Sequence, residues 1–187
     1  MIPSNKNTLL SLEGMTKVFG DNINTDLIMP SQYLDNPDPK YFAQFVMSGV
    51  NPNFIQEVKA LQNEYNLPVI LVAGKNFGSG SSREQAPDGI KHAGIVCVLA
   101  ESFNSIFFRN AINIGLPVVT IANVTEIVKN NFHLRLNLKE GYLEVLKPKI
   151  LKVEFSPLEP FLLRRLEHGG LLPELKKFIK SSKEENK

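Results

Sequence analysis

The sequence predicts an α/β domain built on a mixed sheet, and two patterns carry that prediction. From residue 68 onward, the apolar runs "PVILVAG", "IVCVLA" and "LPVVTI" alternate with segments of helical periodicity, which is typical of parallel βαβ units. Later, "FHLRLNL" alternates apolar and polar residues before a turn and two more short runs, which indicates an antiparallel meander. The 187 residues are 43% hydrophobic and 21% charged, enough for one core. We therefore expect a single domain over residues 1–187.

The N-terminal third predicts a strand, a long loop and two helices. Residues 9–19, "LLSLEGMTKVF", are expected to form the strand. Residues 20–40 are rich in Asp, Asn and Pro but include several apolar side chains, so we expect a loop that packs on the body of the protein. Pro39 is expected to begin a helix that ends at Gly49. The segment 53–65 has the composition of a second helix.

The remaining elements follow in alternation. The segment "SREQAPDGIKHAG" predicts a short helix capped by Ser81 or Ser82 and closed by Gly94. Because Pro87 lies inside this segment, the helix is either kinked there or begins later. Further along we expect strands at 95–100 and 116–121, helices at 102–115 and 123–131, the meander at 132–155, and terminal helices at 156–170 and 171–180. Residues 181–187 are expected to fray into solvent.

Charge and cysteine content narrow the classes of function. A net charge of +2 gives no strong field to attract nucleic acid or an anionic membrane. The single cysteine, Cys97, lies in a predicted strand and excludes an internal disulfide or a multi-cysteine metal site. The three histidines are far apart in the sequence, and no apolar run approaches the ~20 residues that span a bilayer. We therefore expect a cytoplasmic protein with no metal of its own.

The stretch "GKNFGSGSSREQAP" (74–87) is the richest in small and charged residues, and its plainest interpretation is a tight βα turn. A nucleotide-phosphate loop is disfavoured, because no lysine follows the second glycine and Arg83 stands where G-x-G-x-x-G needs a glycine. The third interpretation is a catalytic loop that binds an anion. Exposed backbone N–H groups attract a carboxylate, Arg83 grips it with two hydrogen bonds, and Glu84 holds the arginine.

The earlier stretch "NINTD" supplies a possible complement to this loop. Thr25 and Asp26 lie between hydrophobic residues that anchor the backbone. They form either an Asx turn of purely structural value or, in the functional interpretation, a site in which Asp26 is the partner of Arg83 or of a catalytic serine.

Three motifs in this order, "GDNINTD", "AGKNFGSGSSREQAP" and "ESFNSIFFRNAINIGLPV", resemble the small subunits of 3-isopropylmalate dehydratases, the swivel domain of the aconitase superfamily. The resemblance extends from about Phe19 to "HGGLLPELKKFIK". It implies a three-layer β/β/α fold with a mixed sheet. It also implies a hydro-lyase, active only with a large subunit, that interconverts 3-isopropylmalate and 2-isopropylmalate in leucine biosynthesis. The large subunit of that family carries a [4Fe–4S] cluster, which agrees with the single cysteine here, since a cluster needs about three or four thiolates.

The resemblance also implies roles for individual residues. It assigns Ser81 as the base that removes the substrate proton, Arg83 as the carboxylate clamp, and Asp26 as a catalytic neighbour. Substrate binding falls to Ser79, Gly80, Ser82 and Thr25. The chain departs from the family pattern at Ser79, where Cys is usual, and at Gln85, where His is usual. We expect neither change to abolish activity.

The segment Leu27–Pro39 is expected to set substrate choice. In the resembling enzymes that take a third carboxylate, a cation comes from the loop after the "TD" motif. Here that loop contains no Arg, Lys or His and offers Met29, Tyr33 and Leu34 instead, so an apolar substituent is expected to fit and a carboxylate to be disfavoured. The alternatives are a related hydratase of the citramalate, homoaconitate or aconitate type, and a non-catalytic regulatory or binding module on the same fold.

Overall fold

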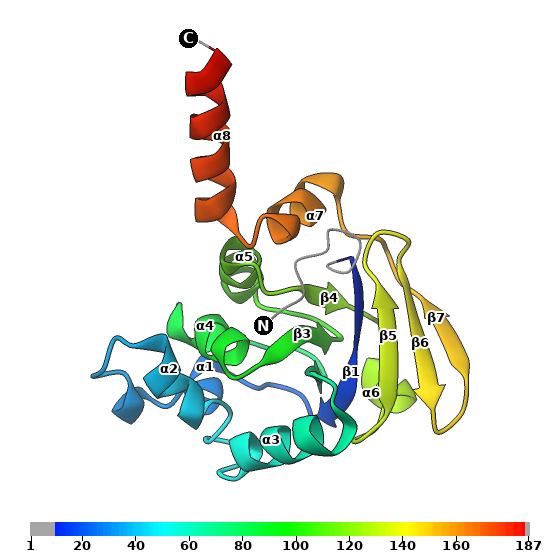
Figure 1. The fold of residues 1–187 in the computed structure, drawn as a ribbon. Coiled ribbons are helices and arrows are strands. Elements are labelled where there is room, and N and C mark those ends of the chain that lie inside the picture. Colours follow the sequence, from blue (N-terminus) through cyan, green and yellow to red (C-terminus); the bar gives the residue numbers. More distant parts are fainter. Residues whose placement is uncertain (1–9, 186–187) are drawn as a thin grey trace.

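Seven strands form one mixed sheet in the computed structural model, which describes residues 10–185 (Figure 1). The strands are β1 (Ser11–Val18), β2 (Val69–Ala73), β3 (Ile95–Ala100), β4 (Val118–Thr120), β5 (His133–Asn137), β6 (Tyr142–Lys147) and β7 (Leu151–Glu154). Their order across the sheet is β4-β3-β2-β1-β5-β6-β7. The four strands from β4 to β1 are parallel, and β5, β6 and β7 form the antiparallel meander.

Strand β1 joins the two parts. Thr16 pairs with Ile70 of the parallel strand β2, and Leu12 pairs with Leu136 of the antiparallel strand β5. The predicted α/β class with a mixed sheet is therefore confirmed, and its antiparallel part continues the parallel part edge to edge. In Figure 1 the sheet curls, with β5, β6 and β7 turned away from the helices that flank β1 to β4.

The helices connect the parallel strands and close the chain. They are α1 (Thr25–Ile28), the 3₁₀ helix η1 (Ser31–Tyr33), α2 (Pro39–Phe42), the 3₁₀ helix η2 (Ala43–Phe45), α3 (Phe54–Tyr65), α4 (Gln85–His92), α5 (Ser105–Ile114), α6 (Val124–Ile127), α7 (Pro160–Glu167) and α8 (Leu171–Glu185). Strands β2 and β3 read as nearly continuous apolar runs because their residues are buried, as both faces of a parallel sheet require.

The segment 20–40 is packed down as expected, but it has secondary structure of its own. Ile28 and Met29 are fully buried, and the Asn24 side chain caps α1 by accepting from the N–H of Leu27 at 2.9 Å. Pro39 begins α2 as predicted, but the helix does not reach Gly49. It ends early because the chain turns to bond α1, with the Met47 N–H donating to Ile28 O at 2.7 Å.

Helix α4 corrects the predicted caps of the glycine-serine segment. Neither Ser81 nor Ser82 caps it: the cap position is Glu84, and the helix begins at Gln85. Pro87 then lies in the first turn, where its missing N–H costs no helical hydrogen bond. Gly94 follows the helix with φ of +84°, as predicted.

The C-terminal helices leave the body of the protein. Figure 1 shows α8, in red, extending away from the sheet, and it meets the rest of the chain chiefly where it begins, beside α5 and α7. Glu174 ties it to α7 by accepting from Arg164 at 2.8 Å and Arg165 at 3.2 Å. The structure continues α8 through Glu185, and residues 186–187 lie outside the described part, so fraying over 181–187 stays a prediction.

Candidate functional site

The loops that follow β1 and β2 run side by side beyond the ends of their strands. Three backbone hydrogen bonds of 2.8 Å link them: Asn22 N–H to Lys75 O, Gly78 N–H to Ile23 O, and Thr25 N–H to Ser79 O. The carboxyl ends of parallel strands are where α/β proteins bind ligands. Residues 20–29 and 74–84, which belong to the two stretches singled out in the sequence (20–40 and 74–87), therefore meet at the edge of the sheet that favours a site. We call the joined loops the strand-end rim.

Glycines allow the rim to take this path. Gly78 has φ of +74°, and a Cβ there would stand 2.2 Å from the Phe107 ring, which packs edge-on against Phe77 at 5.2 Å between centroids. Gly80 has φ of +94°, and its Cβ would lie 3.2 Å from Thr25 Oγ1. A larger side chain at either position would push the loop off its aromatic support or away from Thr25.

Thr25 and Ser81 form a pair of hydroxyls within the rim. Thr25 is 2% exposed, and its Oγ1 lies 3.0 Å from Ser81 O and 3.2 Å from Ser81 Oγ. Ser81 itself is exposed, as are Gly80 and Ser82, whereas Ser79 is half-buried. Ser81 thus lies at the surface, with its hydroxyl within hydrogen-bond distance of the buried hydroxyl of Thr25.

Arg83 is fixed beside this pair by two partners from the α1 segment. Its Nη2 lies 2.5 Å from Asp26 Oδ1, and its Nη1 donates to Met29 O at 2.9 Å. Among the residues described, Asp26 rather than Glu84 holds this guanidinium, so that part of the sequence prediction is corrected. Two of the five guanidinium N–H groups are engaged in these contacts, which leaves the other three available to an anion.

Backbone donors next to Arg83 complete an anion site. The N–H groups of Gly80, Ser81 and Ser82 make no hydrogen bond within residues 10–185. Successive exposed N–H groups in a loop with left-handed residues attract carboxylates and other anions. The rim therefore combines a supported hydroxyl, a held guanidinium and three free backbone donors.

Of the three residues expected to set substrate choice, only Leu34 lines a hollow beside this rim. Leu34 is half-buried and lines a hollow of about 310 Å³ that it shares with Phe42, Glu84 and Gln85. Tyr33 instead stacks its ring on Phe45, with 3.9 Å between centroids. Met29 does not line the surface as expected, because its side chain is fully buried; only its carbonyl serves the site, through Arg83.

Sequence reasoning missed the residues that hold the rim together. Asp21 Oδ1 accepts from the Lys75 N–H at 2.7 Å, and Asn76 Nδ2 donates to Asn22 Oδ1 at 3.0 Å. Asn22 and Asn76 both have positive φ, 59° and 61°. The available signal was their residue type, since Asn tolerates the left-handed conformation and bonds nearby backbone better than most side chains do.

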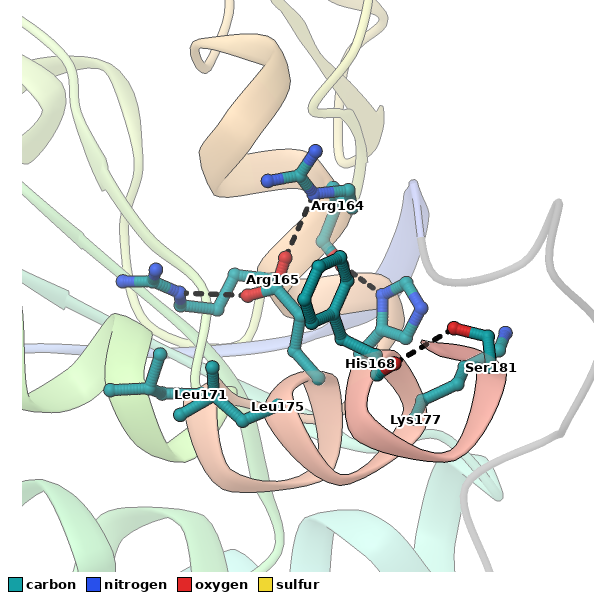
Figure 2. A pocket seen from close by; sticks show the side chains of 9 residues that line it. Arg164, Arg165, His168, Leu171, Leu175, Lys177 and Ser181 are labelled. Carbon is teal, nitrogen blue, oxygen red and sulfur yellow. Dashed lines mark hydrogen bonds and ion pairs between the residues drawn. The ribbon is translucent and has the colours of Figure 1, made fainter. Parts of the chain in front are cut away.

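Two larger hollows lie elsewhere on the described surface. One, of about 470 Å³, lies between α7 and α8, and Figure 2 shows the bonded side chains of Arg164 and Arg165 in it. The other, of about 740 Å³, lies between α5 and α7 and includes Arg109 and Phe161. Neither hollow contains Ser81 or Arg83. Gly80, Ser81 and Ser82 of the strand-end rim are exposed on this chain.

Metal-binding groups and membrane-spanning helices are absent from the part of the chain that the structure describes. Within residues 10–185, no three His, Cys, Asp or Glu side chains are grouped so that they could hold a metal ion. Cys97 is fully buried in β3, and burial raises the pKa of its thiol far above its ordinary value. No helix in the same range is long and apolar enough to cross a membrane.

Comparisons with known proteins give one consistent result. Residues 7–124 match the family described as the aconitase C-terminal domain. The isopropylmalate/citramalate isomerase small subunit of Methanocaldococcus jannaschii is 45% identical over 91% of this chain and 97% of its own length. The 3-isopropylmalate dehydratase small subunit of Halothermothrix orenii is 41% identical over 91% and 99% of the two chains. A crystal structure of 3-isopropylmalate dehydratase from M. jannaschii superposes with a TM-score of 0.77 at 38% identity, covering 92% and 99%.

Proposed function

The chain belongs to the aconitase C-terminal domain family, and from this premise we propose that it is the small subunit of a 3-isopropylmalate dehydratase. In this role it is one half of a hydro-lyase that interconverts 3-isopropylmalate and 2-isopropylmalate by removing water and adding it back. We expect the reaction to take place in the cytoplasm.

The observation that carries the proposal is the strand-end rim. Ser81 is exposed and supported by Thr25, and Arg83 is held by Asp26 with three N–H groups to spare. A structural turn has no need of a half-buried arginine with unused donors beside three unpaired backbone N–H groups. A dicarboxylate substrate needs such groups, because each of its carboxylates must be bound by cations or hydrogen-bond donors. This argues against the alternative of a non-catalytic module.

The chemistry of the rim fits removal of a proton next to a carboxylate. We assign Arg83 and the N–H groups of Gly80 and Ser82 to the substrate carboxylate, which they hold in one orientation. Ser81 is the base, and the same donors favour its anionic form, as preorganised dipoles do at sites where charge develops. Asp26 is a positioning residue that aims Arg83. Ser79 lines the site at the edge of the rim.

An iron–sulfur cluster does not fit the residues of this chain. Cluster ligation uses thiolates, and the single cysteine is buried in β3 with its pKa raised by that burial, which favours the neutral thiol. We therefore propose that a large subunit carries the [4Fe–4S] cluster of the family and closes over the strand-end rim. No step assigned to this chain requires the cluster.

We further propose that the substrate carries an apolar substituent. Leu34 lines the hollow beside Gln85, and Glu84 and Asp88 line it too, so it offers an apolar wall and carboxylates rather than a cation. A carboxylate left unpaired there would be disfavoured by about 2–5 kcal/mol, or ~30-fold or more in specificity. Isopropylmalate fits this lining, and so does the smaller citramalate; citrate and homocitrate do not.

The test is anaerobic co-expression of the full chain with its large subunit, followed by assays on isopropylmalate, citramalate, citrate and homocitrate. We expect turnover of isopropylmalate only in the assembled enzyme, at a kcat/KM at least ~30-fold above that for homocitrate. Leu34→Arg or Asp35→Arg should move this ratio toward homocitrate. No turnover of isopropylmalate by the complex would refute the function, and an unmodified enzyme that prefers citrate or homocitrate would refute the assigned substrate class.

A further inference from the structure

The hydroxyl of Thr25 has two acceptors on one residue. Its single proton can point to Ser81 O, at 3.0 Å, or to Ser81 Oγ, at 3.2 Å. Ser81 O does not depend on Thr25, because it also accepts from the Arg83 N–H at 2.9 Å. The Thr25 proton can therefore turn from the carbonyl to Oγ without leaving that carbonyl unpaired.

Each direction suits one charge state of Ser81. While Ser81 carries its proton, Thr25 can donate to Ser81 O and receive the Ser81 proton on its own Oγ1. This directs the Ser81 lone pairs to the exposed side of the rim. When Ser81 is anionic, Thr25 can donate to Oγ, and a hydrogen bond to a charged acceptor is stronger than one between neutral groups.

The surroundings of Thr25 hold it at this distance and keep water from taking its place. Thr25 is 2% exposed; its N–H is bonded to Ser79 O at 2.8 Å, and its carbonyl accepts from Met29 N at 2.9 Å in α1. Gly80 has no side chain, and any Cβ there would lie 3.2 Å from Thr25 Oγ1. Exposed Ser81 thus meets solvent on one side and a fixed, dry donor on the other.

We propose that Thr25 is a positioning residue that acts through Ser81: it orients the protonated hydroxyl and, by turning its own proton, stabilises the Ser81 anion. This inference rests on the proposed function, in which Ser81 is the base. In the dehydration step the Ser81 oxygen takes the substrate proton: an O–H bond forms, the C–H bond breaks, and its electron pair enters the new C=C bond as hydroxide leaves. The Thr25 proton changes direction and is never transferred.

The first test compares Thr25→Val, which keeps the shape and removes the hydroxyl, with Thr25→Ser, which keeps the hydroxyl. In the assembled enzyme we expect Thr25→Val to lower kcat by about 10- to 100-fold with KM within threefold, the loss expected for one hydrogen bond to an anion. The rising limb of the kcat–pH profile should move to higher pH by about one unit. Thr25→Ser should restore kcat to within about fivefold.

Thr16→Val is the matched control. Thr16 is also fully buried, and its hydroxyl bonds the carbonyls of Lys129 and Phe132 at 2.6 and 3.2 Å, away from the rim. This substitution should lower thermal stability and leave the pH profile in place. If Thr25→Val has a wild-type profile, or if Thr16→Val moves the profile equally, the proposal is overturned.

A second test does not depend on turnover. The isolated full chain is treated with diisopropyl fluorophosphate over a range of pH, and the labelled serines are identified by mass spectrometry. We expect Ser81 to react faster than its exposed neighbour Ser82, and this preference to fall about tenfold or more in Thr25→Val and to return in Thr25→Ser. Equal labelling of the two serines, or a preference unchanged in Thr25→Val, would overturn the proposal. A complex that is inactive on isopropylmalate would refute the proposed function. The labelling result would then still decide whether Thr25 stabilises the Ser81 anion.

Discussion

One arginine–carboxylate pair lies in the antiparallel half of the sheet and another lies just beyond the end of the parallel half, and the two pairs differ in what surrounds them. In the antiparallel half, Arg135 donates to Glu13 across the face of the sheet, at 3.1 and 3.0 Å, and it is 44% exposed. At the end of the parallel half, Arg83 bonds Asp26 and a carbonyl, is 20% exposed and borders unpaired backbone donors. The first pair is flanked by further ionisable side chains, His133 bonded to Glu13 and Glu144 near Arg135, whereas the second borders unpaired backbone donors that can receive an anion.

The comparison teaches that position in the sheet, rather than the pair itself, separates a structural ion pair from a functional one. Cross-strand pairs on an exposed face stabilise a sheet modestly. The carboxyl ends of parallel strands leave loops free to gather donors. Substitutions in the antiparallel half should therefore change stability and not activity, and those in the rim should do the opposite.

Ser81→Ala should show the largest contrast between the two effects. We expect the turnover of the assembled enzyme to fall roughly 10³- to 10⁴-fold, since the base is lost. The free energy of unfolding should change by less than about 0.5 kcal/mol, because the side chain is exposed. Steady-state kinetics and thermal unfolding measure the two quantities, and near-normal turnover would show that the base is another group.

Arg83→Lys and Arg135→Lys form a matched pair across the sheet. Lysine keeps the charge and loses the planar fork, so Arg83→Lys should lower kcat/KM by about 100-fold, mainly through KM. Arg135→Lys should leave kcat/KM within twofold. Equal losses in the two variants would mean that Arg83 is only a structural partner of Asp26.

Glu13→Gln should act on stability alone, in a pH-dependent way. Partial burial raises the pKa of Glu13, but hydrogen bonds and charges from Arg135 and His133 outweigh burial and hold that pKa below its ordinary 4.5. A lowered pKa in the folded state stabilises the fold above pH 4.5, and the contribution is lost as the pH falls through the lowered value.

The variant should therefore unfold more easily than the natural chain at pH 7, by about 0.5 kcal/mol, and the difference should be smaller at pH 3. Denaturant unfolding at the two pH values measures it, with the activity of the complex at pH 7 as the control. A difference at pH 3 as large as that at pH 7, or a loss of turnover, would contradict the assignment of Glu13 to the structural half.

Ser79→Cys should have the smallest effect. Ser79 lies in the rim, but its bond to Thr25 is made by its backbone carbonyl, which the substitution keeps. We expect kcat and KM within about twofold of the natural values. A large loss would mean that the Ser79 hydroxyl itself meets the substrate more closely than we propose.

The sequence predicted most of the fold, because its strands are either fully apolar or strictly alternating. Its failures came where tertiary contacts decide. Helix α2 stops early because Met47 bonds α1, and α4 begins after the serines that could have capped it because their loop follows the neighbouring strand end. Composition alone does not predict the early end of α2 or the late start of α4.

For the site, the sequence indicated Ser81, Arg83 and Asp26 but not how they are arranged. Thr25 was expected to bind substrate and is instead 2% exposed beneath Ser81. Glu84 was expected to hold Arg83 by its adjacency in the chain, yet Asp26 does so from another loop. The burial of Thr25 and the partner of Arg83 depend on side-chain direction and on contacts between distant segments. The folded sheet determines both, and the identity of neighbouring residues in the sequence does not.

The place of β1 in the middle of the sheet also has a consequence for how the chain folds during synthesis. One edge of β1 pairs with β2, and the other edge pairs with β5, which follows more than a hundred residues later. Ribosomes add about 5–20 residues per second, so the second edge stays unpaired for roughly 5–20 s after β1 emerges. An open strand edge is a template for pairing with other chains. Glu13 and Lys17 give β1 charged side chains, which disfavour pairing with other chains until β5 has been synthesised.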